Sequence, residues 1–176
     1  MPEARKNIMP FTHILHALDL SDDMHRTLCK SIALANALES HLTLIHVIKE
    51  TKPTTELMIQ AVLGYGSKDE MKQKSREKIM GELKNLLRKM CDEYSSKLPA
   101  CRFSLSGIIV EFGQPVNNIL RQAESGAYDL LVVGRHDYGL VDEILLGHST
   151  RGLLRYCPIP VLQVPLKNCT MTLSNV

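Results

Sequence analysis

The sequence lacks the cysteine pattern of a zinc site or of a disulfide-bonded fold. Its five cysteines are odd in number and widely spaced, and none belongs to a Cys-x-x-Cys pair. They are Cys29, Cys91, Cys101, Cys157 and Cys169. The first ten residues carry mixed charge and contain no apolar stretch of the kind found in secretory signals. These absences favour a reducing compartment, and we expect a cytoplasmic protein.

The sequence also has no long apolar run and no block of basic residues. Because no stretch of about 18 apolar residues occurs, no membrane-spanning helix is expected. The 21 lysines and arginines nearly balance the 19 aspartates and glutamates, which leaves a net charge of +2. The basic residues within 68–94 are typical of a solvated helix face. We therefore expect neither a membrane nor a nucleic acid as partner, and small molecules and proteins remain.

What the sequence does contain is enough apolar material for one domain. A chain of 176 residues with 44% hydrophobic residues can bury roughly two thirds of its unfolded surface, and no internal repeat is visible. We expect a polar N-terminal segment over residues 1–10, one domain over residues 11–166 and a short polar C-terminal tail over residues 167–176.

Apolar strands alternate with amphipathic helices along the domain. Continuous apolar runs, typical of strands buried on both faces of a parallel sheet, predict strands over residues 11–20, 41–50, 103–112, 128–134 and 159–164. Helices are expected in between: after a cap at Ser21 or Asp22, over 68–94, after the start signal Gly113-Gln114-Pro115, and over 149–156. This order predicts an α/β fold with a single doubly wound, five-stranded parallel sheet of Rossmann-like type, strand order 3-2-1-4-5 and helices on both faces.

Two strand ends in this fold are candidate ligand positions. In doubly wound sheets, ligands bind outside the carboxyl ends of the strands, where the strand order reverses. Asp19 ends the first predicted strand, and Gly134 ends the fourth. A short helix predicted over 55–63 leaves open whether that segment folds as a lid over this edge. Topology alone therefore predicts a pocket near Asp19 and Gly134.

Three segments carry a resemblance to a known family. They are Asp19-Leu20-Ser21, "GQPVNNILRQAESGAYDLLVVG" and "LLGHSTRGLLRYCPIPVLQVP". Over residues 11–165 the chain resembles the universal stress proteins, a branch of the adenine-nucleotide α-hydrolase-like folds. The ATP-binding branch of that family has the motif Gly-x2-Gly-x9-Gly-Ser/Thr. Gly134 and Gly147 keep the spacing of the outer glycines. Asp137 replaces the middle glycine, and His148 replaces the hydroxyl residue.

The resemblance implies an adenine nucleotide as ligand, ATP or AMP, with Mg²⁺ if a triphosphate binds. Asp19 would face the ribose or the phosphates, Val47 would offer backbone hydrogen bonds to adenine, and Val133 would line the base pocket. The implied binding set is Asp19, Val47, Val133, Gly134, Asp137, Gly147, His148, Ser149 and Thr150. Other interpretations stay open, because valines at these positions suit the core of any parallel sheet and Asp19 equally suits a helix cap.

The altered loop places negative charge where the motif has open backbone. Glycine lets backbone N–H groups approach phosphate oxygens, and Asp137 puts a carboxylate there. Two unit charges about 4 Å apart interact by roughly 4 kcal/mol at an effective dielectric near 20, on the order of a thousandfold in affinity. Residues 134–148 carry a net charge of −2 with both histidines neutral. Mg²⁺ bound to Asp137, protonation of His136 and His148, or close approach at Gly139 would each relieve this repulsion.

Two functions are compatible with the sequence. One is a stress-response interaction or regulatory module that forms a homodimer through the last strand near Val161 to Val164, with nucleotide binding weakened or lost. The alternative is an adenine-nucleotide-binding stress protein that uses the loop from Gly134 to Thr150. No nucleophile–base pair is visible, so we expect no enzyme beyond slow ATP hydrolysis. The strand histidines His13, His16 and His46 are interpreted as hydrogen-bonded core residues or edge residues and not as ligands.

Overall fold

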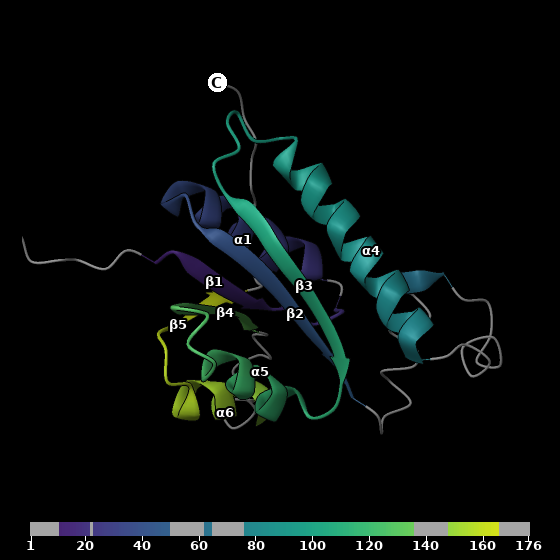
Figure 1. Ribbon diagram of the computed structural model, residues 1–176, viewed down its shortest axis with the longest axis vertical. Coiled ribbons are helices and arrows are strands. Elements are labelled where there is room, and N and C mark those ends of the chain that lie inside the picture. Colours follow the sequence, from purple (N-terminus) through teal and green to yellow (C-terminus); the bar gives the residue numbers. More distant parts are fainter. Residues whose placement is uncertain (1–10, 22, 50–61, 65–75, 136–147, 166–176) are drawn as a thin grey trace, which may run out of the picture.

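A computed structural model describes residues 11–21, 23–49, 62–64, 76–135 and 148–165. Within these residues, five parallel strands form one sheet in the order β3-β2-β1-β4-β5 (Figure 1). The strands are β1 (His13–Ala17), β2 (His41–Ile48), β3 (Ser104–Phe112), β4 (Leu130–Arg135) and β5 (Val161–Pro165). The predicted fold class and strand order are confirmed.

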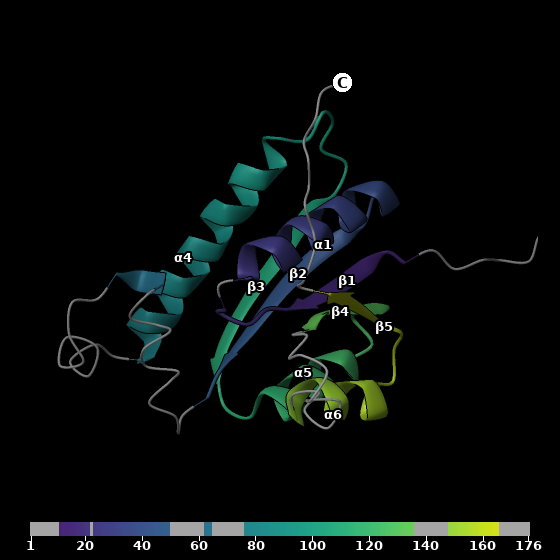
Figure 2. The same cartoon turned by 180° about the vertical axis from the view of Figure 1, so that it is seen from behind.

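Helices cover both faces of this sheet (Figures 1 and 2). They are α1 (Met24–Leu38), α4 (Arg76–Ser95), α5 (Pro115–Ala123) and α6 (His148–Tyr156). Helices α1 and α4 pack on one face, and α5 and α6 pack on the other. Of the short helix predicted over 55–63, the structure describes Val62 and Leu63, which are helical and pack against the α1 and α4 side. The other residues of that segment lie outside the described residues.

Side chains of the inner strands alternate between the two cores. In β1, Ile14 packs in the cluster with α1 and α4, and Leu15 packs in the cluster with α5 and α6. Because both faces are covered, the inner strands β1, β2 and β4 are mostly apolar along their whole length. By the same alternation, His16 shares the face of Ile14. In β2, His46 shares the face of Leu44, so both histidines lie on the α1 and α4 side.

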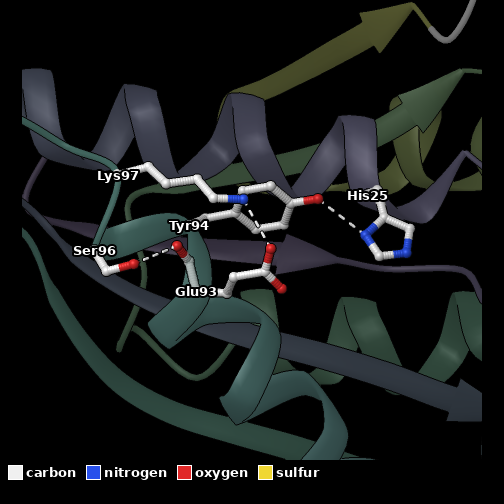
Figure 3. A network of polar contacts seen from close by, with 5 residues as sticks. All are labelled: His25, Glu93, Tyr94, Ser96 and Lys97. Atoms are coloured by element: carbon white, nitrogen blue, oxygen red, sulfur yellow. Dashed lines mark hydrogen bonds and ion pairs between the residues drawn. The ribbon is translucent and has the colours of Figure 1, made fainter.

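A polar network joins α1 and α4 at the surface (Figure 3). His25 Nδ1 of α1 and the Tyr94 hydroxyl of α4 share a hydrogen bond of 2.9 Å. Just beyond α4, the Lys97 ammonium donates to the Glu93 carboxylate at 2.7 Å and lies 5.3 Å from the centre of the Tyr94 ring. His25, Glu93 and Lys97 are exposed, so we expect these polar contacts to add little to the stability that the apolar contacts beneath them provide.

Candidate functional site

Strand β1 ends earlier than both of its neighbours. Its last register pairs join Ala17 to Ile45 of β2 and to Val133 of β4. Strand β2 continues to Ile48, and β4 continues to Arg135. The chain passes from β1 to β2 on one side and from β3 to β4 on the other, so the strand order reverses here. The carboxyl end of β1 is therefore the position at which this fold accommodates a ligand.

Asp19 and Gly134 both reach this edge, as predicted from topology. Asp19 lies two residues beyond Ala17, the last residue of β1, and Gly134 follows Val133 within β4. Asp19 is exposed, and its carboxylate accepts a hydrogen bond from the Ser21 hydroxyl at 2.7 Å. A carboxylate in this position can accept further hydrogen bonds from ligand hydroxyls.

The start of α1 differs from the prediction. Its N-cap is Asp23, and the Asp23 side chain makes no capping hydrogen bond. Ser21, one of the two predicted caps, donates its hydroxyl to Asp19 instead. Asp22, the other predicted cap, lies outside the described residues. The Ser21 hydroxyl thus binds the Asp19 carboxylate and not the first turn of α1.

The backbone of Val47 faces the side of β2 on which β1 has ended. The Ile45 carbonyl points toward β1, because it accepts a hydrogen bond from the Leu18 N–H at 2.9 Å. The Ile48 carbonyl points toward β3, because it accepts from the Gly113 N–H at 3.0 Å. Alternate residues of a strand direct their backbone groups to the same neighbour. The N–H and C=O of Val47 therefore face the same side as those of Ile45.

The side chains of Val47 and Val133 belong to the core between the sheet and the α5 and α6 layer. They are 7% and 3% exposed, respectively, and lie in the same apolar cluster. Their burial agrees with the core interpretation of both valines. A ligand at the end of β1 would consequently meet the main chain of Val47 and only a small part of the Val133 side chain.

The first turn of α6 supplies the third element of the predicted site. Helix α6 runs from the carboxyl edge of β4 back to the start of β5, and His148, Ser149 and Thr150 are its first residues. Backbone N–H groups in a first turn have no partner within their own helix and attract anions. Asp137 and Gly147, the other two loop residues of the predicted set, lie outside the described residues.

Two buried histidines next to this edge were missed as site residues. The His46 side chain is 7% exposed, and His16 is 0% exposed. His46 Nδ1 is hydrogen-bonded to the Leu18 carbonyl at 2.9 Å. In the described part of the chain, neither ring nitrogen of His16 has a hydrogen-bond partner. The interpretation of His16 as a core residue is confirmed, but the hydrogen bonds expected for it are not seen among the described residues. The signal that could have drawn attention to both residues is a histidine inside a mostly apolar strand.

Burial keeps both histidines neutral at pH 7. It lowers the pKa of His16 to about 3, and the nearby Asp19 carboxylate offsets only part of this effect. Burial also lowers the pKa of His46, although the bond to Leu18 and the charge of Asp19 oppose it. Neither imidazole therefore adds a positive charge beside Asp19 at pH 7.

Neither a metal cluster nor a membrane span is seen in the described ranges. Within them, no three His, Cys, Asp or Glu side chains are arranged to hold a metal ion. No helix described by the structure combines the length and the apolar character needed to cross a bilayer.

Comparison with known proteins gives a family match over most of the chain. Residues 10–165 match the model of the Universal stress protein family. The chain is 27% identical over 164 residues to the Universal stress protein MJ0577 of Methanocaldococcus jannaschii, with 90% of this chain and 97% of that protein covered. The solved structure of MJ0577 has a TM-score of 0.61 to this chain at 26% identity and covers 90% of this chain and 99% of its own.

Two more distant solved structures share the fold. A universal stress protein in complex with cAMP has a TM-score of 0.57 at 18% identity, with 89% of this chain and 98% of that chain covered. A universal stress protein family protein from Arabidopsis thaliana with AMP bound has a TM-score of 0.53 at 16% identity, with 93% and 97% covered. The fold, the strand order and the match over residues 10–165 agree. The chain belongs to the universal stress protein family.

Proposed function

We propose that the protein is a regulatory stress protein that binds an adenine nucleotide with a single phosphate at the carboxyl end of β1. The observation that carries this proposal is the arrangement at that edge. The backbone of Val47, the carboxylate of Asp19 and the first turn of α6 are brought there by three different strand ends. These groups accept and donate hydrogen bonds and include no nucleophile–base pair, so the proposed role is binding.

Each of these groups suits one part of the nucleotide. The backbone N–H and C=O of Val47 can pair with the edge of adenine in the way that two strands pair. The Asp19 carboxylate accepts a hydrogen bond from the Ser21 hydroxyl, and a carboxylate suits the ribose hydroxyls better than the phosphate, which it repels. Backbone N–H groups of the first turn of α6, from His148 to Thr150, suit the phosphate.

The limit to one phosphate comes from the charge of the loop before α6. Residues 134–148 carry a net charge of −2 with neutral histidines, so every added phosphate meets repulsion. Two proteins of the same fold were solved with cAMP or AMP, each of which has one phosphate. Both observations support a nucleoside monophosphate over a triphosphate as the ligand.

Ligand release and titration test the proposal directly. Purified protein is heated, the released material is identified by mass spectrometry, and AMP, cyclic AMP and ATP are then titrated with and without Mg²⁺. We expect a monophosphate to bind more tightly than ATP. Asp19→Asn is expected to weaken AMP binding by about tenfold, the equivalent of one hydrogen bond to a charged group.

Asp23→Asn is the matched control for this variant. It makes the same change in charge four residues further on, where Asp23 lies 3.5 Å from Arg26 in an exposed ion pair. We expect it to leave AMP affinity unchanged. Tighter AMP binding by Asp19→Asn would place Asp19 beside the phosphate and not the ribose. If wild-type protein binds none of the three nucleotides, the binding proposal fails.

A second function, homodimerisation, is favoured by the surface of α6 and β5. Strand β5 is the outer strand of the sheet next to β4. Of the five large hydrophobic side chains that are exposed in the described residues, three lie on these two elements: Leu154, Tyr156 and Leu162. An edge strand beside exposed apolar side chains favours pairing with another strand. We therefore propose a homodimer that pairs through residues Val161 to Val164.

A charge placed on β5 should separate the proposed dimer. Leu162→Lys is expected to raise the dimer dissociation constant at least about tenfold, because an ammonium group would have to be desolvated in the interface. Leu38→Lys on α1 is the control, since Leu38 is 39% exposed and Leu162 is 40% exposed. Sedimentation velocity over a range of concentrations measures both. A wild-type protein that stays monomeric at high concentration would rule out this interface.

A further inference from the structure

Leu18 is held to β2 by two hydrogen bonds just past the end of β1. Its N–H donates to the Ile45 carbonyl at 2.9 Å, and its carbonyl is bonded to His46 Nδ1 at 2.9 Å. The backbone register between the two strands ends at the pair Ala17 and Ile45. The His46 side chain therefore continues the attachment of the chain to β2 beyond the point at which strand pairing stops.

This bond determines which nitrogen of His46 carries the hydrogen. A carbonyl oxygen can only accept, so Nδ1 must be the donor. Burial lowers the pKa of His46 and keeps the ring neutral at pH 7, so Nε2 carries no hydrogen. In the described ranges Nε2 has no hydrogen-bond partner. The polar contact that this ring makes there is the one to Leu18.

We propose that His46 is a positioning residue for the nucleotide site, and that it acts through Leu18 to place Asp19 and Val47 relative to each other. The inference rests on the proposed function. His46 immediately precedes Val47, and Leu18 immediately precedes Asp19. The bond thus joins the two chain positions next to the two ligand-facing groups. The imidazole lies on the α1 and α4 face, opposite the Val47 side chain, and acts through the backbone.

Three variants separate this role from simple core packing. His46→Asn keeps a donor nitrogen at the same number of bonds from Cα as Nδ1, whereas His46→Leu removes the donor and fills the space with an apolar side chain. Val110→Ala is the matched control. Val110 is the register partner of His46 on β3, it is 4% exposed, and it packs in the core on the same face. Its truncation weakens that core without removing the bond to Leu18.

The first measurement needs no ligand. Amide hydrogen exchange of Leu18 is recorded for each variant relative to the slowest-exchanging core amides. We expect exchange at Leu18 to be at least about tenfold faster in His46→Leu than in Val110→Ala, and close to the wild-type rate in His46→Asn. If His46→Leu does not fold, the ¹⁵N chemical shifts of the His46 ring in the wild-type protein provide a second test. The proposal requires a ring that is protonated at Nδ1 and carries no hydrogen at Nε2.

The second measurement is AMP affinity on the same proteins. His46→Leu is expected to bind AMP at least about tenfold more weakly, while His46→Asn and Val110→Ala stay within about threefold of the wild type. Identical exchange and affinity in His46→Leu and Val110→Ala would overturn the positioning role, as would an Nε2-protonated ring. If no protein binds AMP but the exchange rates differ as expected, the failure lies in the proposed function and the placement of Leu18 by His46 stands.

Discussion

Lowering the pH from 7 to 5 is expected to reduce the free energy of unfolding by about 2 kcal/mol through His16 alone. Burial lowers the pKa of His16 in the folded protein to about 3. An unfolded histidine titrates near pH 6.5. Between these two values the unfolded chain binds a proton that the folded protein excludes, so stability falls as the pH falls. The lowered pKa of His46 acts in the same direction.

Replacing His16 by leucine should remove the His16 contribution to this pH dependence and stabilise the protein. In register, His16 lies between Leu44 of β2 and Val132 of β4, and both are fully buried. A leucine matches these neighbours and removes a buried ring whose nitrogens have no partner in the described residues. We expect His16→Leu to raise the free energy of unfolding at pH 7 by about 1 to 3 kcal/mol. Urea unfolding at pH 5, 6 and 7 measures both effects.

Ile14→Val serves as the control for this comparison. Ile14 is fully buried on the same strand and face as His16, and neither isoleucine nor valine titrates. This change should lower stability by about 1 kcal/mol and leave its pH dependence as in the wild type. If His16→Leu retains the full wild-type difference between pH 7 and pH 5, the imidazole takes up a proton in the folded state as readily as in the unfolded one, and the argument from burial is wrong.

Asp137→Gly is expected to tighten ATP binding by up to about a thousandfold. The residue stands at the middle glycine of the Gly-x2-Gly-x9-Gly motif. A carboxylate about 4 Å from a phosphate charge costs roughly 4 kcal/mol at an effective dielectric near 20. AMP, with one phosphate, should gain less than ATP. Calorimetric titration of both nucleotides gives the two changes.

Asp137→Asn separates charge from shape in this comparison. It removes the negative charge but keeps a Cβ, so a gain similar to that of Asp137→Gly would assign the effect to charge. A gain seen in Asp137→Gly alone would assign it to close approach of the backbone. The opposite result, weaker ATP binding by both variants in the presence of Mg²⁺, would show that the Asp137 carboxylate holds the cation and would refute the repulsion argument.

The sequence predicts the framework of this protein better than the details of its site. Apolar runs covered on both faces predict parallel strands, and alternation with helices predicts which edge receives Asp19 and Gly134. The family resemblance implies that the Val47 backbone faces the ligand, but the apolar pattern alone does not predict this direction, because it depends on the register that pairs Ala17 with Ile45. A histidine in an apolar run also does not reveal whether its nitrogens find partners. His46 has one through the Leu18 carbonyl, and His16 has none in the described residues, although both lie on the same face.

The early end of β1 has a consequence for how binding of a base can be kept while the side chains around it change. An adenine bound beside Val47 would occupy the position at which further residues of β1 would otherwise pair with β2. The backbone N–H and C=O of Val47 would then form its hydrogen bonds. Main-chain recognition makes no demand on the identity of the side chain whose backbone binds the base, so Val47 can change freely within the limits of core packing. The feature that must be kept is a length difference between neighbouring strands. A sequence change at Val47 that keeps this length difference would therefore leave the main-chain groups for the base in place.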